Sequence, residues 1–174
     1  MRHLLPVSLL LLVLCAGPRG YSQLRNPAPA AVDTVTVSRL KEIVASNVGN
    51  VVLVNAWATW CKPCREEMPS LLRIRNEYRG KQFALILVSA DDLDELDSVV
   101  KPALGRFGVD FPTYIIHDST DDAFIRGMDP GWSGALPASF LYDDRGRLVK
   151  MFTGERSYKQ FAKAVAAALK RRGS

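Results

Sequence analysis

The sequence is poor in metal-binding side chains. Its 174 residues include three cysteines and two histidines, His3 and His117. A tetrahedral zinc site would need a second Cys-x-x-Cys pair or a pair of histidines close together. We therefore expect no metal site, and we expect His117, which follows the apolar run TYII, to lie at the end of a strand.

An extended basic region is also missing. The net charge of +5 comes from 23 basic and 18 acidic residues spread along the chain, and the basic cluster is confined to 170–172 near the C-terminus. Cations in this position suit the end of a helix, where they complement the helix dipole. Nucleic acid is therefore not an expected partner. The length suits one domain with an ordinary hydrophobic core.

The longest apolar run is too short to span a membrane. Arg2 and His3 precede LLPVSLLLLVLCA, about 13 residues without a charge, whereas a spanning helix needs roughly 20. The pattern is typical of a secretory signal peptide. We predict a signal peptide over 1–22, a Pro- and Ala-rich linker over 23–34 and one folded domain over 35–174. An uncleaved membrane anchor and a lipid on Cys15 are the alternatives. Each places the domain outside the cytoplasm, in the periplasm or another extracytoplasmic compartment.

The two remaining cysteines, Cys61 and Cys64, lie in the stretch WATWCKPCREEMP. A structural disulfide between them would close a loop of only two intervening residues and would add little stability. The preceding NVVLVNAW predicts a buried strand, and the following CREEMPSLLRIRNEY predicts a helix. Cys61 then lies at a helix N-terminus, where unpaired N–H groups and the helix dipole stabilise a thiolate. The thiolate is the form that attacks disulfides.

The residues around the pair favour the same chemistry. Lys62 adds a positive charge beside the sulfur, and Pro63 suits an early helical position because its missing N–H has no partner there. We predict that Cys61 is an exposed nucleophile and that Cys64 is a more buried resolving thiol.

The rest of the chain alternates between strand and helix patterns. QFALILVSA and FPTYIIHD predict two further strands, ASFLYDDRGRLVKMFTG predicts a hairpin, and SYKQFAKAVAAALKRR predicts a final amphipathic helix. This order predicts an α/β domain with a mixed sheet covered by helices.

The combination of motifs resembles the thioredoxin fold. WATWCKPC follows a buried strand, Pro69 stands five residues after Cys64, and ALPASFLYDDRGR precedes a hairpin. The NAW and CREEMP stretches resemble the TlpA/ResA branch of exported thiol-disulfide oxidoreductases, over roughly residues 35–169. The resemblance implies a mixed central sheet with helices on both faces and an inserted strand–helix unit. We assign that unit to QFALILVSADD and DELDSVV.

The resemblance also implies roles for individual residues. Cys61 is the nucleophile, Cys64 is the resolving thiol, and Pro137 matches the cis-proline that faces the dithiol. The substrate-contacting positions are Trp60, Lys62, Pro63 and Leu136. Trp132, near Pro137, is either a partner-contact residue or a packed core aromatic.

The acid that deprotonates the resolving thiol is not at its usual place. Asn55 stands where thioredoxins usually carry a buried aspartate, and an amide cannot accept a proton. The TlpA/ResA branch often places a carboxylate after the next strand, so Asp91 is our candidate proton acceptor and Asp92 the fallback. Both acids are alternatively solvated residues at a loop end.

These features predict an exported enzyme that reduces disulfides in partner proteins through a mixed disulfide, without a cofactor. The resemblance implies a membrane thiol-disulfide relay as electron donor and cytochrome c apoproteins among the clients. A disulfide oxidase or isomerase with the same Cys-x-x-Cys and a non-enzymatic binding module are the alternatives. A peroxiredoxin is disfavoured, because Val54 and Ala58 replace the Pro and Thr of the pattern Pro-x-x-x-Thr-x-x-Cys.

Overall fold

The computed structural model describes residues 30–118 and 120–171, so the predicted signal peptide over 1–22 lies outside the described residues. The strands are β1 (Val32–Val35), β2 (Val51–Trp57), β3 (Phe83–Ser89), β4 (Thr113–Ile116), β5 (Ala138–Tyr142) and β6 (Leu148–Thr153). The α-helices are α1 (Val37–Ser46), α2 (Lys62–Glu77), α3 (Lys101–Phe107), α4 (Asp121–Met128) and α5 (Tyr158–Lys170). A short 3₁₀ turn, Leu93–Glu95, and a π-helical turn, Leu96–Val100, precede α3.

The described strands form one mixed sheet in the order β1-β4-β3-β2-β5-β6. β1, β4, β3 and β2 run parallel, whereas β5 is antiparallel to β2 and β6 is antiparallel to β5. Every residue of β2 is buried, as expected for an apolar, β-branched strand covered on both faces. β2 ends at the centre of the sheet, and the segment that follows it carries the cysteine pair.

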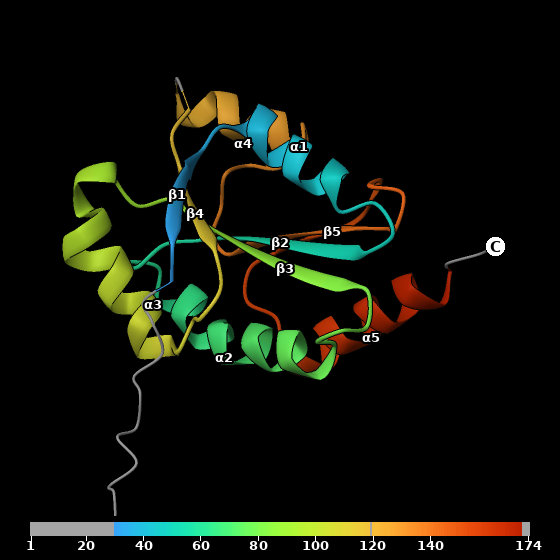
Figure 1. The fold of residues 1–174 in the computed structure, drawn as a ribbon. Coiled ribbons are helices and arrows are strands. Elements are labelled where there is room, and N and C mark those ends of the chain that lie inside the picture. Colours follow the sequence, from blue (N-terminus) through green and yellow to red (C-terminus); the bar gives the residue numbers. More distant parts are fainter. Residues whose placement is uncertain (1–29, 119, 172–174) are drawn as a thin grey trace, which may run out of the picture.

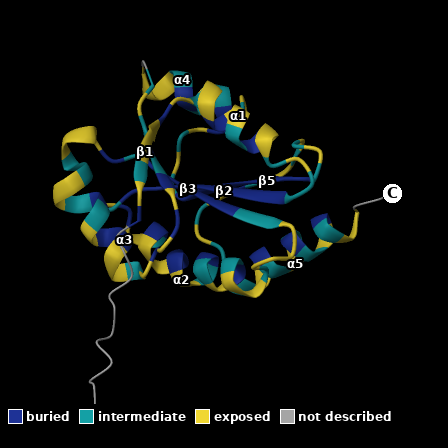
Figure 2. Cartoon of the chain, in the orientation of Figure 1, coloured by how far each residue is buried: buried dark blue, intermediate teal, exposed yellow. Residues whose placement is uncertain are grey.

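Helices cover both faces of this sheet, which confirms the predicted α/β architecture. α1 and α4 lie on one face, and α2, α3 and α5 lie on the other (Figure 1). Each face has its own apolar cluster, one containing Leu40, Val54 and Phe124 and the other containing Leu53, Leu71 and Phe161. The central strands β2, β3 and β5 are mostly buried, whereas the edge strands β1 and β6 and the outer faces of the helices are largely exposed (Figure 2). The segment after β2 is therefore attached to a strand that is packed on both faces.

Two details differ from the sequence prediction. The sheet begins at Val32, which pairs with Thr113, inside the segment predicted as linker. The strand assigned to the inserted unit, β3, pairs with β2 along its whole length and is buried at the centre of the sheet. That assignment is wrong, because a strand in this position belongs to the core of the sheet. β4 lies between β3 and β1 in the sheet, so β4, with the helix α4 that follows it, is better placed to be the additional unit.

Candidate active site

Cys61 and Cys64 form a disulfide where β2 gives way to α2, with their Cα atoms 5.3 Å apart. Cys61 is the N-cap residue of α2, and its sulfur accepts a hydrogen bond from the backbone N–H of Cys64 at 3.2 Å. A thiolate at Cys61 in the reduced protein would meet the same N–H and the positive end of the helix dipole. The site therefore lowers the energy of the reactive form of Cys61.

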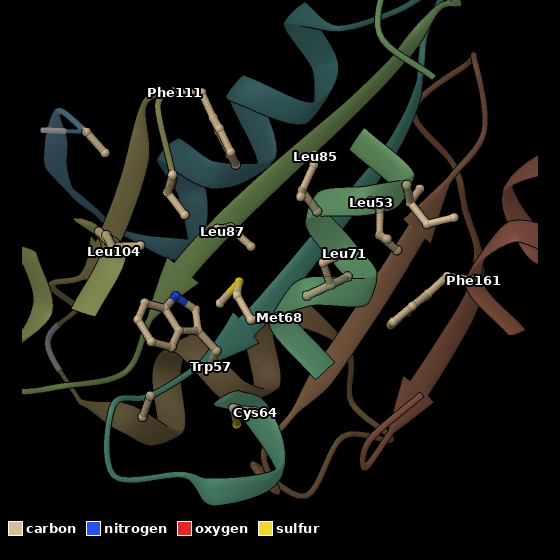
Figure 3. Packing of buried hydrophobic residues seen from close by; sticks show 14 of the residues in the cluster. Leu53, Trp57, Cys64, Met68, Leu71, Leu85, Leu87, Leu104, Phe111 and Phe161 are labelled. Atoms are coloured by element: carbon tan, nitrogen blue, oxygen red, sulfur yellow. The ribbon is translucent and has the colours of Figure 1, made fainter. Parts of the chain in front are cut away.

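The two sulfurs differ in burial less than expected. Cys61 is 5% exposed and Cys64 is fully buried, so the predicted order holds. The prediction of an exposed Cys61 is wrong for the oxidised state, because Cys61 packs into the same apolar cluster as Cys64. Figure 3 shows Cys64 at the start of α2, with Met68 and Leu71 further along that helix.

The residues between and beside the cysteines are exposed or half-buried. Lys62 is exposed and forms an ion pair with Glu66 at 3.7 Å, and Pro63 occupies the first turn of α2. Trp60 is 66% exposed, which is unusual for so large an apolar side chain. This exposed aromatic side chain therefore lies next to Cys61 in the chain.

The Leu136–Pro137 peptide bond is cis, as the resemblance implied. Ala138, which follows it, pairs with Ala56 near the end of β2, so the proline lies beside the segment that carries the cysteines. Leu136 packs against the apolar cluster that contains both cysteines. The structure thus brings the cis-proline loop and the dithiol to the same end of the sheet.

Asp91 is buried, but its contacts are with the loop that precedes the cysteines. Its carboxylate accepts the backbone N–H of Thr59 at 3.0 Å and the Thr59 hydroxyl at 2.5 Å. The other oxygen accepts a hydrogen bond from the Ser89 hydroxyl. These bonds tie the Cys-x-x-Cys loop to the end of β3, which is a positioning role. Asp92 is exposed.

A second buried carboxylate, Glu67, was missed at the sequence level. It is 1% exposed and lies one helical turn after Cys64, on the same buried face of α2. Burial raises the pKa of Glu67 from 4.5 to about 7, although the N–H of Arg156 and the Asn55 side chain donate hydrogen bonds that favour the carboxylate. The sequence does contain one signal for its burial, which is spacing. Glu67 lies three residues after Cys64 and four before Leu71, on the helical face that is otherwise apolar.

Asn55 belongs to the same buried network. Its Nδ2 donates to Glu67 Oε1 at 2.7 Å and to the Ser139 hydroxyl at 2.9 Å. The backbone N–H of Arg156 donates to the other Glu67 oxygen at 2.9 Å. Asn55 is not itself an acid, but it positions the Glu67 carboxylate by a hydrogen bond. The network joins β2, α2, β5 and the segment after β6.

The other two tryptophans belong to the core. Trp57 is buried and contacts Phe107 edge-on, with ring centroids 6.2 Å apart. Trp132 is buried between Phe124 and Phe140, and its indole N–H donates to the carbonyl of Ala135 at 3.0 Å. Of the two roles considered for Trp132, the structure therefore shows that of a packed core aromatic.

A groove of about 390 Å³ lies beside the dithiol. Trp60 and Leu136 border it together with Asp91, Trp132 and the end of β4. It runs from the exposed Trp60 to Leu136, the residue before the cis-proline.

Among the described residues, no group of three or more His, Cys, Asp or Glu side chains is placed to hold a metal ion. No helix within 30–118 and 120–171 is both long and apolar enough to cross a membrane.

A Cys-x-x-Cys disulfide at a helix N-terminus, beside a cis-proline loop on a mixed sheet, defines a thioredoxin-fold protein. The sequence matches the Redoxin family over residues 23–168, and the chain belongs to that family. It is 35% identical over 112 residues to thiol-disulfide oxidoreductase ResA of Bacillus thuringiensis, covering 64% of this chain and 60% of that protein. It is 28% identical over 126 residues to the thioredoxin-like protein YneN of Bacillus subtilis, covering 72% and 69%.

Solved structures have the same fold. The thiol:disulfide interchange protein of the thioredoxin family from Chlorobium tepidum superposes with a TM-score of 0.62 at 26% identity, covering 82% of this chain and 97% of that one. These likenesses confirm the TlpA/ResA type. The match spans about 60% of the length of the first ResA relatives.

Proposed function

We propose that this chain is an exported thiol-disulfide oxidoreductase that reduces disulfides in partner proteins. The observation that carries the proposal is the Cys61–Cys64 disulfide at the N-terminus of α2, with Cys61 as the N-cap residue. A pair in this position can alternate between dithiol and disulfide without moving the sheet. The names of the relatives, which are thiol-disulfide oxidoreductases, support the same chemistry.

The reaction takes two exchange steps. In the reduced protein the Cys61 thiolate attacks one sulfur of a partner disulfide, a bond forms between Cys61 and that sulfur, and the other partner sulfur leaves as a thiolate. Cys64 then loses its proton and attacks the Cys61 sulfur. The mixed disulfide breaks, the partner leaves as a dithiol after taking up protons, and the Cys61–Cys64 disulfide forms. Two electrons pass from this chain to the partner, so no cofactor is required.

The proton of Cys64 needs an acceptor in a buried place. Glu67 lies one turn along the same helix and has its pKa raised to about 7 by burial, which suits proton exchange near neutral pH. Asp91 was the acceptor expected from the sequence, and its oxygens are engaged by Thr59 and Ser89. We assign proton acceptance to Glu67 and the positioning of the Cys61 loop to Asp91.

The partner would contact three surfaces at this end of the sheet. Trp60 offers an exposed aromatic face, Leu136 borders the groove, and the cis Pro137 precedes the strand residue that pairs with Ala56 near the end of β2. Lys62 and Pro63 border the cysteines at the helix N-terminus. The natural clients are proteins with accessible disulfides, with cytochrome c apoproteins as the proposed example. A membrane thiol-disulfide relay is the proposed electron donor, because an extracytoplasmic dithiol must be reduced again after each turnover.

Two variants test the proposal with insulin as substrate. Cys61→Ser abolishes insulin reduction, whereas Cys64→Ser retains the attack and accumulates a mixed disulfide that reducing agent releases. Mass spectrometry of the trapped adduct locates the bond. Full activity of Cys61→Ser would contradict the assignment of the nucleophile, and failure of both the wild type and Cys64→Ser to react with any disulfide would contradict the function.

A further inference from the structure

A second groove lies between the β5–β6 hairpin and α5. Its volume is about 620 Å³, larger than that of the groove beside the dithiol. We call it the hairpin groove, and it is bordered by residues of β6, of the hairpin turn and of α5. Neither cysteine, Trp60 nor Pro137 borders it. Disulfide exchange at Cys61 therefore leaves this surface unused.

The hairpin groove gathers positive charge. Two acidic residues, Asp143 and Asp144, also line it, and Asp143 is paired with Arg147 at 2.8 Å. Six of the 23 basic residues of the chain border this groove, but only two of its 18 acidic residues do. The rest of the sequence is nearly balanced. The basic residues are Arg145, Arg147, Lys150, Arg156, Lys163 and Arg171.

The groove is also bordered by the free edge of the sheet. β6 is the outermost strand, and its described partner is β5 alone. Four consecutive residues, Val149 to Phe152, line the groove. Successive side chains of a strand point to opposite faces, so a groove that touches all four runs along the edge of the strand. Backbone N–H and C=O groups at such an edge can pair with another extended chain.

Apolar surface accompanies the charge. Val149 is 42% exposed, and Ala164 and Ala168 of α5 border the groove opposite Phe152. Lys150 Nζ lies 4.8 Å from the centre of the Phe152 ring, so the cation and the ring share one surface. A partner segment with alternating acidic and apolar residues would match this surface.

An alternative explanation for basic residues on an edge strand is that they prevent the strand from pairing with the same strand of another copy. That role requires charge on the strand, such as Lys150. It does not require Lys163 of α5 or Arg171, the C-cap residue of α5, which border the groove on its other side. The cations converge on a concave surface from two elements, which suits a chain segment better than a flat membrane.

One end of the groove lies near the dithiol site. Arg156 borders the groove, and its backbone N–H donates to Glu67 at 2.9 Å. Gly154, at the end of β6, donates to the carbonyl of Pro137 at 2.8 Å. A segment lying along β6 would therefore end beside the cis-proline loop.

We propose that the hairpin groove binds an extended acidic segment of a partner protein, which pairs with the free edge of β6 and places its negative side chains against the cations of the hairpin and α5. The proposal does not depend on the redox function, because binding can be measured with the disulfide intact and without turnover.

The test measures binding of labelled peptides to the full, oxidised chain by fluorescence anisotropy. The probe is a 12-residue peptide with alternating glutamate and valine, and its control carries lysine in place of glutamate. The acidic peptide binds, and its affinity falls steeply as salt increases, because charges at the surface are screened beyond about 10 Å at 0.1 M salt. The lysine peptide does not bind. Backbone amides of β6 exchange more slowly in the complex.

Charge-reversal variants locate the site. Lys150→Glu combined with Lys163→Glu weakens binding of the acidic peptide about tenfold or more, while the circular dichroism spectrum is unchanged, which shows that the fold is intact. Lys41→Glu combined with Arg106→Glu makes the same change of charge on α1 and α3, away from the groove, and alters binding less than about twofold. Three outcomes would each overturn the proposal. They are an equal loss of peptide affinity in both double variants, equal binding of the acidic and the lysine peptide, and binding to phosphatidylglycerol vesicles but not to the acidic peptide.

Discussion

Asn55 donates a hydrogen bond to Glu67 across 2.7 Å, and both side chains are buried. The amide cannot exchange a proton, but it fixes a carboxylate that can. Burial raises the pKa of that carboxyl to about 7, where the protonated and ionised forms are both populated near neutral pH. The buried acid of this site is thus supplied by the helix that carries Cys64, and the strand supplies its hydrogen-bond donor.

Replacing Glu67 by glutamine tests proton acceptance. The variant keeps the shape of the side chain but cannot take the proton of Cys64, so the resolving step at pH 7 slows about 100-fold. The wild-type rate of that step rises with pH through about 7, and this rise is lost in the variant. Stopped-flow measurement of mixed-disulfide decay between pH 5 and 9 gives both results. Glu66→Gln, one residue away and exposed, is the matched control and leaves the profile unchanged.

The same carboxyl makes stability depend on pH. Because burial raises the pKa of Glu67 from 4.5 to about 7, the folded protein holds a proton between these values that the unfolded chain has released. The contribution is therefore fully present below about pH 4.5 and is lost as pH rises through about 7. The free energy of unfolding of the oxidised protein falls by about 3 kcal/mol over this window. Urea unfolding at several pH values measures the change, which disappears in Glu67→Gln if the assignment is right and persists if another group is responsible.

Asn55→Asp would place two carboxyl groups within hydrogen-bond distance. Two buried carboxyl groups at this distance share one proton, because ionising the second carboxyl beside the first carboxylate is strongly disfavoured. We expect the apparent pKa of the resolving step to rise by about one unit or more and the protein to become less stable above pH 7. An unchanged pH profile would show that Asn55 and Glu67 are not coupled during the reaction. Asn50→Asp, at the opposite end of β2, is the control for the added charge.

Asp91→Asn separates positioning from proton transfer. An amide at this position has one oxygen to accept hydrogen bonds where the carboxylate has two, so one of the donors on Thr59 and Ser89 loses its partner. We expect a loss of about 1–3 kcal/mol in stability and a slower overall reaction, with the pH midpoint of the resolving step unchanged. A shift of that midpoint would return the role of proton acceptor to Asp91. Asp92→Asn, exposed next to it, is the control.

Much of this site could be predicted from local sequence. The apolar run before Cys61 and the amphipathic run after Cys64 place the pair at a strand-to-helix junction, and the resemblance placed a cis bond before Pro137, where the structure has one. These features depend on neighbours along the chain or on a motif, so the sequence carries them directly.

The buried acid depends on tertiary packing. Glu66 and Glu67 are adjacent and chemically alike, yet one is exposed and the other is enclosed by α2, β2 and the segment after β6. Asp91 is also buried, but the hydroxyls and amide around it make it an anchor for the loop. The helical register of Cys64, Glu67 and Leu71 was the one available signal. The location of β3 at the centre of the sheet likewise depends on strand pairing, which local patterns do not encode.

The direction of electron flow is tested most directly by the reduction potential of the Cys61–Cys64 pair. The oxidised chain is equilibrated with mixtures of reduced and oxidised glutathione, and the fraction of dithiol is measured by thiol alkylation and mass spectrometry. A reductase of partner disulfides requires a potential at or below that of the glutathione pool, about −240 mV or lower, and we predict a value in that range. A potential near about −120 mV, typical of a strong disulfide oxidant, would contradict the proposed reductase.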